Sequence, residues 1–366
     1  MMWMEKVKLS DICSPKQWKT IPTSDLLNEG YPVYGANGII GYYNEYNHEN
    51  PVVTVTCRGA TCGSINITVP KAYVTGNAMC LDDLKNDIEI EYLYYCLKHY
   101  DFKNVISGSA QPQITRQGMD KIYIMLCSRE EQRDIVNKLK KTEKVIKLRK
   151  QELQLLDDLV KARFVEMFGD PVSNPYGYDK VALSDLADIK IGPFGSLLHK
   201  EDYIVGGHPL LNPSHIVDCR ISPVNKLTIS DEKYKELSAY QLKTGDVVMG
   251  RRGEMGRCAV VSEEGFLCGT GSILIRTKGD VTADYIQKTI SFPSFKKTIE
   301  DMAVGQTMPN LNVPIVSSFE IIKPPIEVQD RYYALVEQVD KSKVEIQKAL
   351  NKTQMLFDSL MQEYFG

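Results

Sequence analysis

The sequence predicts an α+β protein in which two mixed α/β domains alternate with two long helices that pair as an antiparallel coiled coil. Three observations lead to this fold class. The 366-residue chain repeats itself internally. Each copy ends in a long stretch without glycine or proline, which is typical of a helix. Each copy begins with short β-type runs separated by turns, which is typical of a small mixed domain.

The internal repeat is clearest near the middle of the chain. The segment ending at Gly169 resembles the segment ending at Gly366, and the two stay in register at an offset of 366 − 169 = 197. The starts also match, Val7 against Val181, but at an offset of 181 − 7 = 174, so the second copy is longer by 197 − 174 = 23. A repeat of this size indicates two copies of one module, not a solenoid. Matching pairs at the longer spacing include Gly108/Gly305, Pro112/Pro309, Gln132/Gln329, Leu153/Leu350, Leu159/Leu356 and Phe168/Phe365.

This repeat divides the chain into five segments. Gly169, followed by Asp170 and Pro171, is typical of a helix end and marks the junction between the two modules. The expected boundaries are a first domain at 1–127, a helix at 128–168, a linker at 169–179, a second domain at 180–323 and a helix at 324–366.

The two long helices have recognisable starts. Ser128 stands three residues before Glu131, the spacing of a capping box, and neither glycine nor proline follows until Phe168. In the second copy, Pro324 and Pro325 end the preceding strand, and the helix is expected from Ile326 to Tyr364. A continuous helix of about 39 residues is roughly 58 Å long.

Apolar residues recur along both helices at spacings of three and four. Neither helix alone can bury such a stripe. Their equal, gap-free lengths favour pairing with each other over two unrelated surface helices. The residues expected in the seam are Leu153, Leu156, Val160, Phe164, Ile346, Leu350, Phe357 and Leu360.

The beginnings of the modules are rich in glycine, asparagine, tyrosine and threonine. Short β-type runs bounded by turns predict strands at 51–56, 64–69, 246–249 and 271–275. A short helix is expected after each set of strands, at 90–97 and at 283–290. A polar stretch closes each domain, at 107–116 and at 305–312.

Composition is that of an ordinary globular protein, with 43% hydrophobic and 25% charged residues. No window of 18 uncharged apolar residues occurs, and the N-terminal residues hold no apolar signal region, so we expect a cytoplasmic protein without a membrane span. Nine cysteines are scattered without a CxxC pair, which favours reduced thiols over a zinc site. The net charge of −3 suggests that partner proteins share any phosphate contacts.

Catalytic signals are weak. Asn174, Pro175 and Tyr176 resemble part of an amino-methyltransferase loop, but its second proline and a Gly-rich cofactor turn are missing. No phosphate-binding P-loop occurs. Asp246 and Glu254 lack the lysine of common metal-dependent nucleases, and the five histidines are dispersed without metal-ligand spacing. We therefore expect no catalytic residue, metal or cofactor in this chain.

Several motifs, in this order and duplicated, resemble the specificity subunit of type I restriction–modification systems. The individual motifs are loose, but their order covers essentially the whole chain. They are Pro15 to Lys19 with Gly30 to Tyr43, the turns at Arg58-Gly59 and Arg252-Gly253, Gly305 to Leu311, Pro324 to Gln329, and Phe168 to Pro171.

The resemblance implies a non-catalytic protein. Its two domains are then target recognition domains, each reading one half of a bipartite DNA site, which is asymmetric because the domains differ. The paired helices are implied to set the half-site spacing and to bind two copies of a DNA methyltransferase subunit. Restriction/translocase subunits complete the complex, and S-adenosylmethionine, ATP and Mg are expected on these partners only. The family also implies adenine as the methylated base.

DNA reading requires planar hydrogen-bonding groups for base edges and cations for phosphates. Arg251 and Arg252 are the strongest candidates because they precede Gly253 in a loop after a predicted strand, and Arg58 occupies the equivalent turn. Gly59 and Gly253 are interpreted as turn formers. The candidates in the first domain are Lys16, Lys19, Asn37, Tyr42, Arg58, Lys71, Gln111, Gln113 and Arg116. Those in the second are Lys190, Ser196, Lys200, Asn212, His215, Arg251, Arg252, Arg257, Gln306 and Asn310.

Some alternatives stay open at this point. The first helix holds eleven basic and seven acidic residues between Arg129 and Arg163, which fits a solvated face or a surface that neutralises DNA between the half-sites. The chain could also be a scaffold or adaptor of the same architecture that binds proteins and not DNA. A third reading is the recognition subunit of a type II-like restriction–methylation enzyme.

Overall fold

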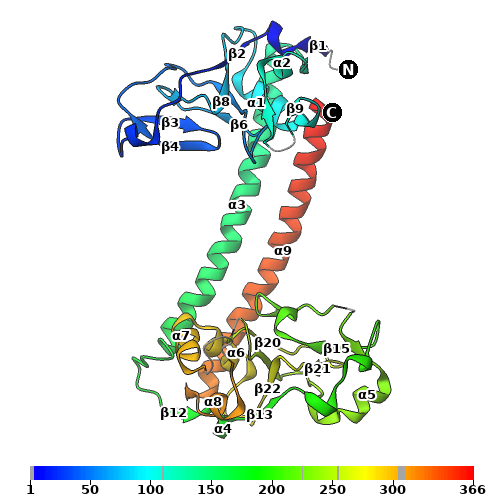
Figure 1. Cartoon of the computed structure of the whole chain (residues 1–366). Coiled ribbons are helices and arrows are strands. Elements are labelled where there is room, and N and C mark those ends of the chain that lie inside the picture. Colours follow the sequence, from blue (N-terminus) through cyan, green and yellow to red (C-terminus); the bar gives the residue numbers. More distant parts are fainter. Residues whose placement is uncertain (1–3, 109–110, 225, 254, 304–309) are drawn as a thin grey trace. The chain divides into compact units, whose positions relative to one another are not determined.

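The computed structural model describes residues 4–108, 111–224, 226–253, 255–303 and 310–366. The chain forms two compact units, the first made of Met1–Leu153 with Glu345–Gly366 and the second of Gln154–Val344. Helices α3 (Arg129–Phe168) and α9 (Ile326–Phe365) each contribute one part to each unit (Figure 1). Among the described residues, no helix combines the length and the apolar character needed to cross a bilayer.

The first unit is built on a four-stranded sheet of order β2-β8-β5-β6 and a three-stranded sheet of order β4-β3-β7. Helix α1 (Ile90–His99) packs against β5 and β6, and α2 (Arg116–Met119) packs near β2. The strands are β1 (Glu5–Lys8), β2 (Ser14–Gln17), β3 (Tyr31–Gly35), β4 (Gly38–Tyr43), β5 (Val53–Thr56), β6 (Ile65–Ile67), β7 (Tyr73–Val74), β8 (Ala78–Asp82), β9 (Ile106–Ser107), β10 (Gln113–Ile114) and β11 (Tyr123–Leu126).

The second unit holds two four-stranded sheets, of orders β13-β22-β19-β20 and β14-β18-β15-β21. Its strands are β12 (Lys180–Ala182), β13 (Ala187–Ile191), β14 (Tyr203–Ile204), β15 (His208–Leu211), β16 (Ile216–Val217), β17 (Arg220–Ile221), β18 (Thr228–Ile229), β19 (Val247–Gly250), β20 (Cys258–Val260), β21 (Leu267–Cys268), β22 (Ser272–Thr277) and β23 (Glu320–Ile322). Its shorter helices are α4 (Leu183–Leu186), α5 (Asp231–Glu236), α6 (Ala283–Ser291), α7 (Pro293–Met302) and α8 (Val313–Ser317).

The sequence repeat is a repeat of structure. Strands β2-β8-β5-β6 correspond to β13-β22-β19-β20, and the parallel pair β3·β7 corresponds to the parallel pair β15·β21. The predicted strands at 51–56, 64–69, 246–249 and 271–275 are confirmed as β5, β6, β19 and β22, and the predicted short helices as α1 and α6. The α+β fold class is therefore confirmed.

The structure locates most of the extra length of the second copy. Strands β3 and β15 begin at an offset of 208 − 31 = 177, whereas β5 and β19 begin at an offset of 247 − 53 = 194. Most of the length difference, 194 − 177 = 17, therefore lies between β15 and β19, where β16, β17, β18 and α5 form. The insertion lies within the domain, away from the long helices.

In the first unit, the early part of α3 packs against the late part of α9. Ile146 of α3 and Leu350 and Phe357 of α9 are buried in one apolar core with residues of α1 and β5. Lys138 Nζ donates to the Tyr364 hydroxyl at 3.4 Å, and the Arg149 guanidinium donates to the Ala349 carbonyl and the Thr353 hydroxyl. The residue numbers of the partners on α9 decrease as those on α3 increase, so the pairing is antiparallel.

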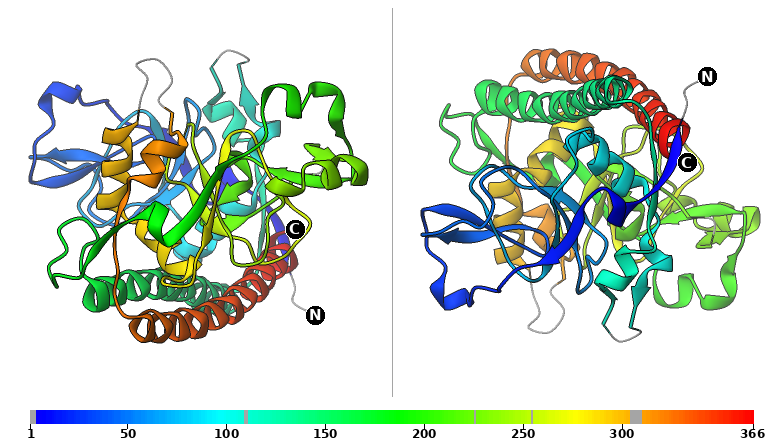
Figure 2. Two further views of the ribbon diagram at one scale, coloured as in Figure 1. Left: turned by 90° about the horizontal axis from the view of Figure 1, so that it is seen from below. Right: turned by 90° about the horizontal axis from the view of Figure 1, so that it is seen from above.

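In the second unit, the late part of α3 packs against the early part of α9. Phe164 is buried with its ring 5.6 Å from that of Tyr332, whose hydroxyl donates to the Val160 carbonyl at 3.1 Å. Lys343 Nζ lies 2.5 Å from Asp157 Oδ1. The helices are again antiparallel, and they lie side by side within each unit in both views of Figure 2.

The predicted seam residues lie on these inward faces to different degrees. Leu153 and Leu360 are half-buried against the first core, and Val160 is half-buried against the second. Leu350, Phe357 and Phe164 are buried. Leu156 and Ile346 are half-buried.

The helix ends follow the expected local chemistry. The Ser128 N–H donates to Glu131 Oε2 at 3.0 Å, and the Glu131 N–H donates to Ser128 Oγ at 3.4 Å, which confirms the capping box. At the other end, Gly169 has φ +76° and its N–H donates to the Val165 carbonyl at 2.8 Å. A side chain at Gly169 would also collide with the Pro175 ring, so glycine is required for two reasons.

A buried glutamine at the start of each long helix joins it to the domain. Gln132 Oε1 accepts the Glu89 N–H at the start of α1 at 2.9 Å, and its amide donates to the Asp87 and Cys127 carbonyls. The repeat partner Gln329 accepts the Thr282 N–H at the start of α6 at 2.9 Å and donates to the Pro324 carbonyl. These bonds satisfy backbone groups that would be costly to bury unpaired.

Leu350→Asp tests the helix pairing. Leu350 is 8% exposed within the first core, so the charge should lower the free energy of unfolding by about 3 to 5 kcal/mol. Leu356→Asp is the matched control, because Leu356 is 53% exposed and substitution there should cost less than about 0.5 kcal/mol. Urea unfolding followed by circular dichroism measures both. Equal losses in the two variants would show that the seam is misplaced.

Candidate nucleic-acid interface

In the first unit, the turn after β5 brings two predicted DNA contacts together. A single antiparallel β-bridge pairs Arg58 with Gln113. The Gly59 N–H donates to the Pro112 carbonyl at 3.1 Å, and the Ile114 N–H donates to the Cys57 carbonyl at 3.0 Å. The arginine turn is therefore fastened to the polar stretch that closes the domain.

Other residues support this turn from below. Gln17 Nε2 lies 2.9 Å from both Cys57 Sγ and the Gly76 carbonyl, which it binds from β2. The Thr56 hydroxyl donates to the Ala36 carbonyl, which brings the β3–β4 turn next to the end of β5. Asn37, the next residue of that turn, is exposed. Gln17 lies in the motif Pro15 to Lys19 and Thr56 in a predicted strand, but neither was among the predicted DNA contacts.

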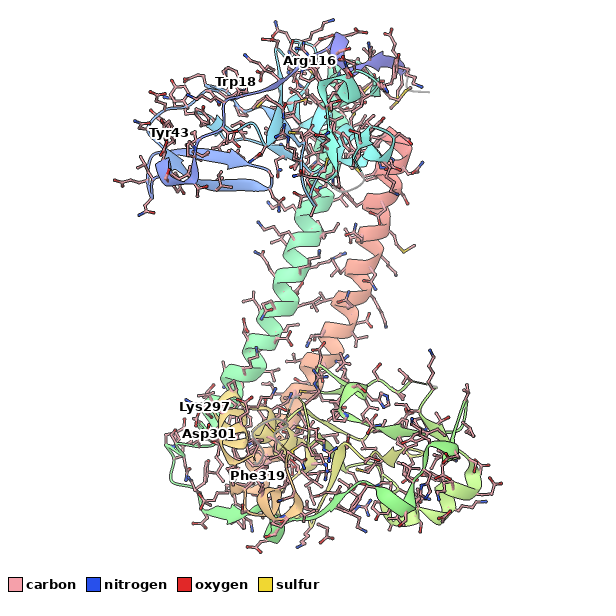
Figure 3. All side chains as sticks on the ribbon, viewed as in Figure 1. Trp18, Tyr43, Arg116, Lys297, Asp301 and Phe319 are labelled. Carbon is pink, nitrogen blue, oxygen red and sulfur yellow. The ribbon has the colours of Figure 1, made fainter. Side chains whose placement is uncertain are left out.

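The exposed side chains of this region suit nucleic acid. Asn37, Gln111 and Gln113 carry planar amides, and Arg58 carries a guanidinium. Arg116 is the first residue of α2, which Thr115 caps by accepting the Gly118 N–H at 3.1 Å (Figure 3). Amides and arginines are the groups that read base edges, and arginines also neutralise phosphates.

The remaining candidates of the first unit occupy other parts of its surface. Lys16 is exposed on β2, with its ammonium 3.8 Å from the centre of the Trp18 ring. Lys19 follows that strand, and Tyr42 is exposed on β4. Lys71 is exposed at φ +55°, with its ammonium 3.9 Å from Glu49 Oε1. These four residues are not part of the bridge around Arg58.

The second unit repeats the bridge with different residues. A single β-bridge pairs Arg252 with Asn310, whose offsets from Arg58 and Gln113 are 252 − 58 = 194 and 310 − 113 = 197. The Leu311 N–H donates to the Arg251 carbonyl at 3.0 Å, and the Arg251 N–H donates to the Gly271 carbonyl at 3.0 Å. The arginine turns of the two modules are thus equivalent in structure as well as in sequence.

The loop after β15 joins this second turn. Asn212 Oδ1 accepts the Gly271 N–H at 3.1 Å, and a Cβ at Gly269 would lie 2.5 Å from the same oxygen. Arg257 Nη1 donates to the Pro213 carbonyl at 3.5 Å. His215 is buried, and its Nδ1 accepts the Asn212 N–H at 3.3 Å. Four predicted residues, Asn212, Arg251, Arg252 and Asn310, therefore belong to one connected region, with Arg257 bonded to its edge.

Arg251 differs from the other arginines of the site because it is only 9% exposed. Within the described residues, its Nε has no hydrogen-bond partner, and neither has the buried Oδ1 of Asn310. Burial, and secondly the charge of Arg252, lower the pKa of the Arg251 guanidinium. The equivalent position of the first module is Cys57 (251 − 194), so the second module alone places a buried cation there. Unpaired buried donors of this kind gain free energy when a ligand supplies an acceptor.

The other predicted DNA contacts of the second unit lie outside the arginine turn, and one of them already binds a protein group. Lys190 Nζ donates to the Ala239 carbonyl at 3.2 Å and lies over the Tyr240 ring. Ser196 and Lys200 are exposed in the 3-10 turns η4 (Gly195–Leu197) and η5 (Lys200–Asp202). Gln306 lies outside the described residues.

The acidic group considered for nuclease chemistry is structural. Asp246 is 2% exposed and accepts from Arg276 Nε at 2.7 Å and Arg276 Nη2 at 2.6 Å. It also accepts the Lys243 N–H at 2.7 Å. Its oxygens are therefore committed to an ion pair in which the carboxylate is buried and the arginine is half-buried. Glu254 lies outside the described residues.

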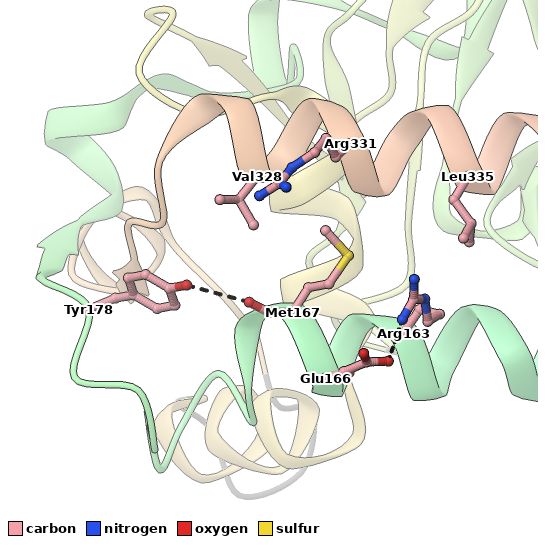
Figure 4. Close-up of a pocket in the computed structure, with 7 residues that line it drawn as sticks. All are labelled: Arg163, Glu166, Met167, Tyr178, Val328, Arg331 and Leu335. Atoms are coloured by element: carbon pink, nitrogen blue, oxygen red, sulfur yellow. Dashed lines mark hydrogen bonds and ion pairs between the residues drawn. The ribbon is translucent and has the colours of Figure 1, made fainter.

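A groove of about 430 Å³ lies between α3 and α9 in the second unit (Figure 4). Arg163 and Arg331 border it, and Arg163 Nη1 is 2.6 Å from Glu166 Oε2. The Tyr178 hydroxyl donates to the Met167 carbonyl at 3.4 Å. Residues of α3 and α9, together with Tyr178, line this groove. No residue of the arginine turn is among its described lining residues.

Comparison with known families gives one match across most of the chain. The model described as "Type I restriction modification DNA specificity domain" matches residues 2–157 and 175–353. Each of the two matched ranges covers most of one copy of the internal repeat.

Named relatives agree with this match. The specificity subunit of the type I restriction enzyme EcoprrI from Escherichia coli is 28% identical over 102 residues, which is 28% of this chain but only a quarter of that protein. The MjaVIII specificity subunit from Methanocaldococcus jannaschii is 20% identical over 323 residues, covering 80% of this chain and 75% of the relative.

Solved structures show the same fold. The type I restriction–modification S subunit from M. genitalium covers 100% of this chain and 96% of its own, with a TM-score of 0.65 and 15% identity. A chain from a study of complex assembly and conformational transition of the type I R-M system gives 0.63 and 17%, covering 99% and 97%.

Loss of the charge at Arg251 and at Asp246 should have different effects on the free energy of unfolding. Arg251→Met removes an unpaired buried donor at similar volume, so the free energy of unfolding should stay within about 1 kcal/mol of wild type. Asp246→Asn leaves Arg276 without its anionic partner and should cost about 2 kcal/mol. Urea unfolding compares the two variants. A large loss in Arg251→Met would show that this guanidinium is paired in solution.

Proposed function

The chain belongs to the family of type I restriction modification DNA specificity domains, and from this premise we propose that it is the DNA-recognition subunit of a type I restriction–modification complex. Each of its two domains reads one half of a bipartite DNA site. The site is asymmetric because the two domains present different side chains. The relatives that share most of this chain's length are themselves named specificity subunits of type I restriction enzymes.

The observation that carries the proposal is the pair of equivalent arginine turns. Both turns are fastened by the same backbone bridge, Arg58 to Gln113 and Arg252 to Asn310. Each module therefore presents one guanidinium and one planar amide on the same backbone arrangement. These groups bind the base edges of guanine and adenine. The surroundings differ, since the second module adds Arg251 and the loop after β15 with Asn212. This combination supports two readers of one design with different sequence preferences.

The helices are proposed to determine the spacing between the half-sites. A continuous helix of 40 residues is about 60 Å long, and both α3 and α9 have this length. The length of a helix depends on its number of residues, so it is independent of the loops that read bases. An insertion such as the one between β15 and β19 then changes what is read without changing the spacing.

The basic face of α3 is partly used within the first unit. Lys140 binds Glu91, Lys138 binds Tyr364, and Arg149 binds α9. Lys141, Lys144, Lys147 and Lys150 are exposed. We assign these four lysines to phosphates of the DNA between the half-sites, as a contribution to affinity that is independent of sequence.

The same helices are proposed to bind two methyltransferase subunits. Leu159 of α3 and Leu356 of α9 occupy equivalent positions of the repeat, and both are exposed, at 42% and 53%. The support for this proposal is that both copies of the repeat expose a large apolar side chain at the same position. Methyl transfer and DNA cleavage then reside on partner subunits, together with S-adenosylmethionine, ATP and Mg.

Arginine variants test the assignment of one domain to each half-site. Cells expressing the chain with its neighbouring methyltransferase subunit should methylate a motif of two short blocks around a fixed gap. Arg58→Ala should relax one block, and the double variant Arg251→Ala, Arg252→Ala should relax the other, because each removes base-edge donors worth about 1 to 3 kcal/mol from one domain. Methylome sequencing reads both blocks at once.

Each arginine variant is the control for the other. In each variant, the block read by the unchanged domain must keep its sequence, and the gap between the blocks must keep its length. Absence of a bipartite motif despite a verified complex would favour the protein-binding scaffold. A single partner polypeptide carrying both methylation and cleavage would indicate the type II-like enzyme.

Leu159→Asp and Leu356→Asp test the docking surfaces. A charge at an exposed position should leave the fold intact but repel an apolar partner surface. Each single variant is expected to reduce the number of bound methyltransferase copies from two to one, and the double variant to abolish binding. Native mass spectrometry of the purified complex counts the copies. Retention of both copies in the double variant would place the docking surface elsewhere.

A further inference from the structure

Three potential metal ligands converge in the first unit, on β8 and on the segment after β4. Cys80 and Asp82 stand two residues apart on β8, so their side chains share one face of the strand. His48 comes from the segment after β4, where a β-bridge to Ala72 holds its backbone. The His48 nitrogen, the Cys80 sulfur and an Asp82 oxygen all lie within 4.8 Å of one another. Histidines dispersed in the sequence gave no sign of this arrangement.

The hydrogen bonds of Asn47 determine the tautomer of His48. Asn47 Oδ1 accepts the Val74 N–H at 2.9 Å, and Asn47 Nδ2 donates to the Val74 carbonyl at 3.0 Å, so the orientation of this amide is settled. His48 Nδ1 lies 2.6 Å from the same Oδ1. Nδ1 must therefore carry a hydrogen and donate it.

The other ring nitrogen of His48 then faces an acceptor. Nε2 lies 2.9 Å from Asp82 Oδ1. A neutral histidine with its hydrogen on Nδ1 points a lone pair at this carboxylate oxygen, which is favourable only if a cation lies between them. That cation is either a proton or a metal ion.

A matched arrangement in the second unit helps to separate these two possibilities. His208 Nδ1 lies 2.9 Å from the Gly265 carbonyl, and His208 Nε2 lies 3.0 Å from Asp231 Oδ1. Among the described residues, no cysteine joins that pair in a ligand cluster. That pair offers two ligand atoms, which is too few to hold a metal ion by themselves. At His48 the additional sulfur of Cys80 completes a nitrogen, sulfur and oxygen set of the kind that binds zinc.

The surroundings of His48 and Asp82 resemble the outer shell of a metal site. Asn47 fixes the ring through the non-ligating nitrogen, and Trp18 Nε1 donates to Asp82 Oδ2 at 3.0 Å. The side chains of His48 and Asp82 are 10% and 11% exposed, and Cys80 is buried.

We propose that His48, Cys80 and Asp82 form a zinc-type metal site with a fourth position for water. Tetrahedral zinc places such ligand atoms about 3.3 to 3.6 Å apart. His48 Nε2 and Asp82 Oδ1, at 2.9 Å, must therefore separate by a few tenths of an ångström. Because the three atoms lie within 4.8 Å of one another, Cys80 Sγ must approach by about 1.2 Å at most. The ion ties the segment around His48 to β8 and so stiffens the first recognition domain. This inference does not depend on the proposed DNA reading.

Cobalt titration of the full chain tests the site. Co²⁺ replaces zinc in such sites and reports a thiolate ligand by its charge-transfer absorption. A Trp3→Phe background leaves Trp18 as the single tryptophan, and its ring lies 5.2 Å from that of His48, so bound Co²⁺ should quench its fluorescence. One equivalent is expected to bind, and Zn²⁺ is expected to displace it.

Ligand variants define the expected losses. Cys80→Ser should abolish the thiolate absorption, and His48→Gln should abolish stoichiometric binding. Asn47→Ala should weaken binding by about 10- to 100-fold, as loss of an outer-shell partner does. His208→Gln and Cys219→Ser are the matched controls, the first a histidine paired with a carboxylate and the second an exposed thiol, and both should bind as wild type does.

Two outcomes would overturn the proposal. Failure of the folded wild-type chain to bind Co²⁺ or Zn²⁺ stoichiometrically would show that a proton alone bridges His48 and Asp82. Binding that survives both Cys80→Ser and His48→Gln would place the metal elsewhere. The titration of the wild-type chain shows whether the metal binds at all, even if a ligand variant does not fold.

Discussion

Each domain depends on an apolar helix face that its own segment of chain cannot cover. The inward face of α3 is covered by α9, and residues of α9 from the C-terminal part of the sequence complete the core of the first unit. Leu350, Phe357 and Met361 are buried beside α1 and β5, which precede them by more than two hundred residues. Burying these side chains contributes on the order of 1.5 to 3 kcal/mol each. The core of the first unit is therefore complete only when the late part of α9 has packed against it.

The two modules share the same backbone contacts but differ in the side chains attached at those positions. Gln132 and Gln329 make the same backbone bonds at the same structural position, and the two arginine turns are fastened by equivalent bridges. These contacts involve backbone groups, so the side chains at the same positions can differ between the copies. Cys57 in one copy and Arg251 in the other occupy equivalent positions, and both are buried. Such separation suits a protein whose two halves share an architecture but read different ligands.

Local signals predicted the elements whose stability is local. The capping box at Ser128, the glycine at Gly169 and the apolar spacing along the helices are all read within a few residues of the feature they specify. Helix ends and strand runs were therefore located to within a few residues, for example Ile90–Leu97 against the observed α1 of Ile90–His99. Weak β-pairs such as β16 with β17 were missed because strands of two residues leave no periodic pattern.

The sequence by itself determined the number of modules, the equal length of the long helices and the resemblance of the two arginine turns, because a repeat in register is a property of the chain alone. It also identified Arg58 with Gln113, and Arg252 with Asn310, without indicating that each pair is in contact. Only the tertiary structure decided these contacts, the burial of Arg251 and the convergence of His48 with Cys80 and Asp82. The physical reason is that strand pairing joins residues far apart in the chain, and no local preference encodes which distant partner a turn or loop will meet.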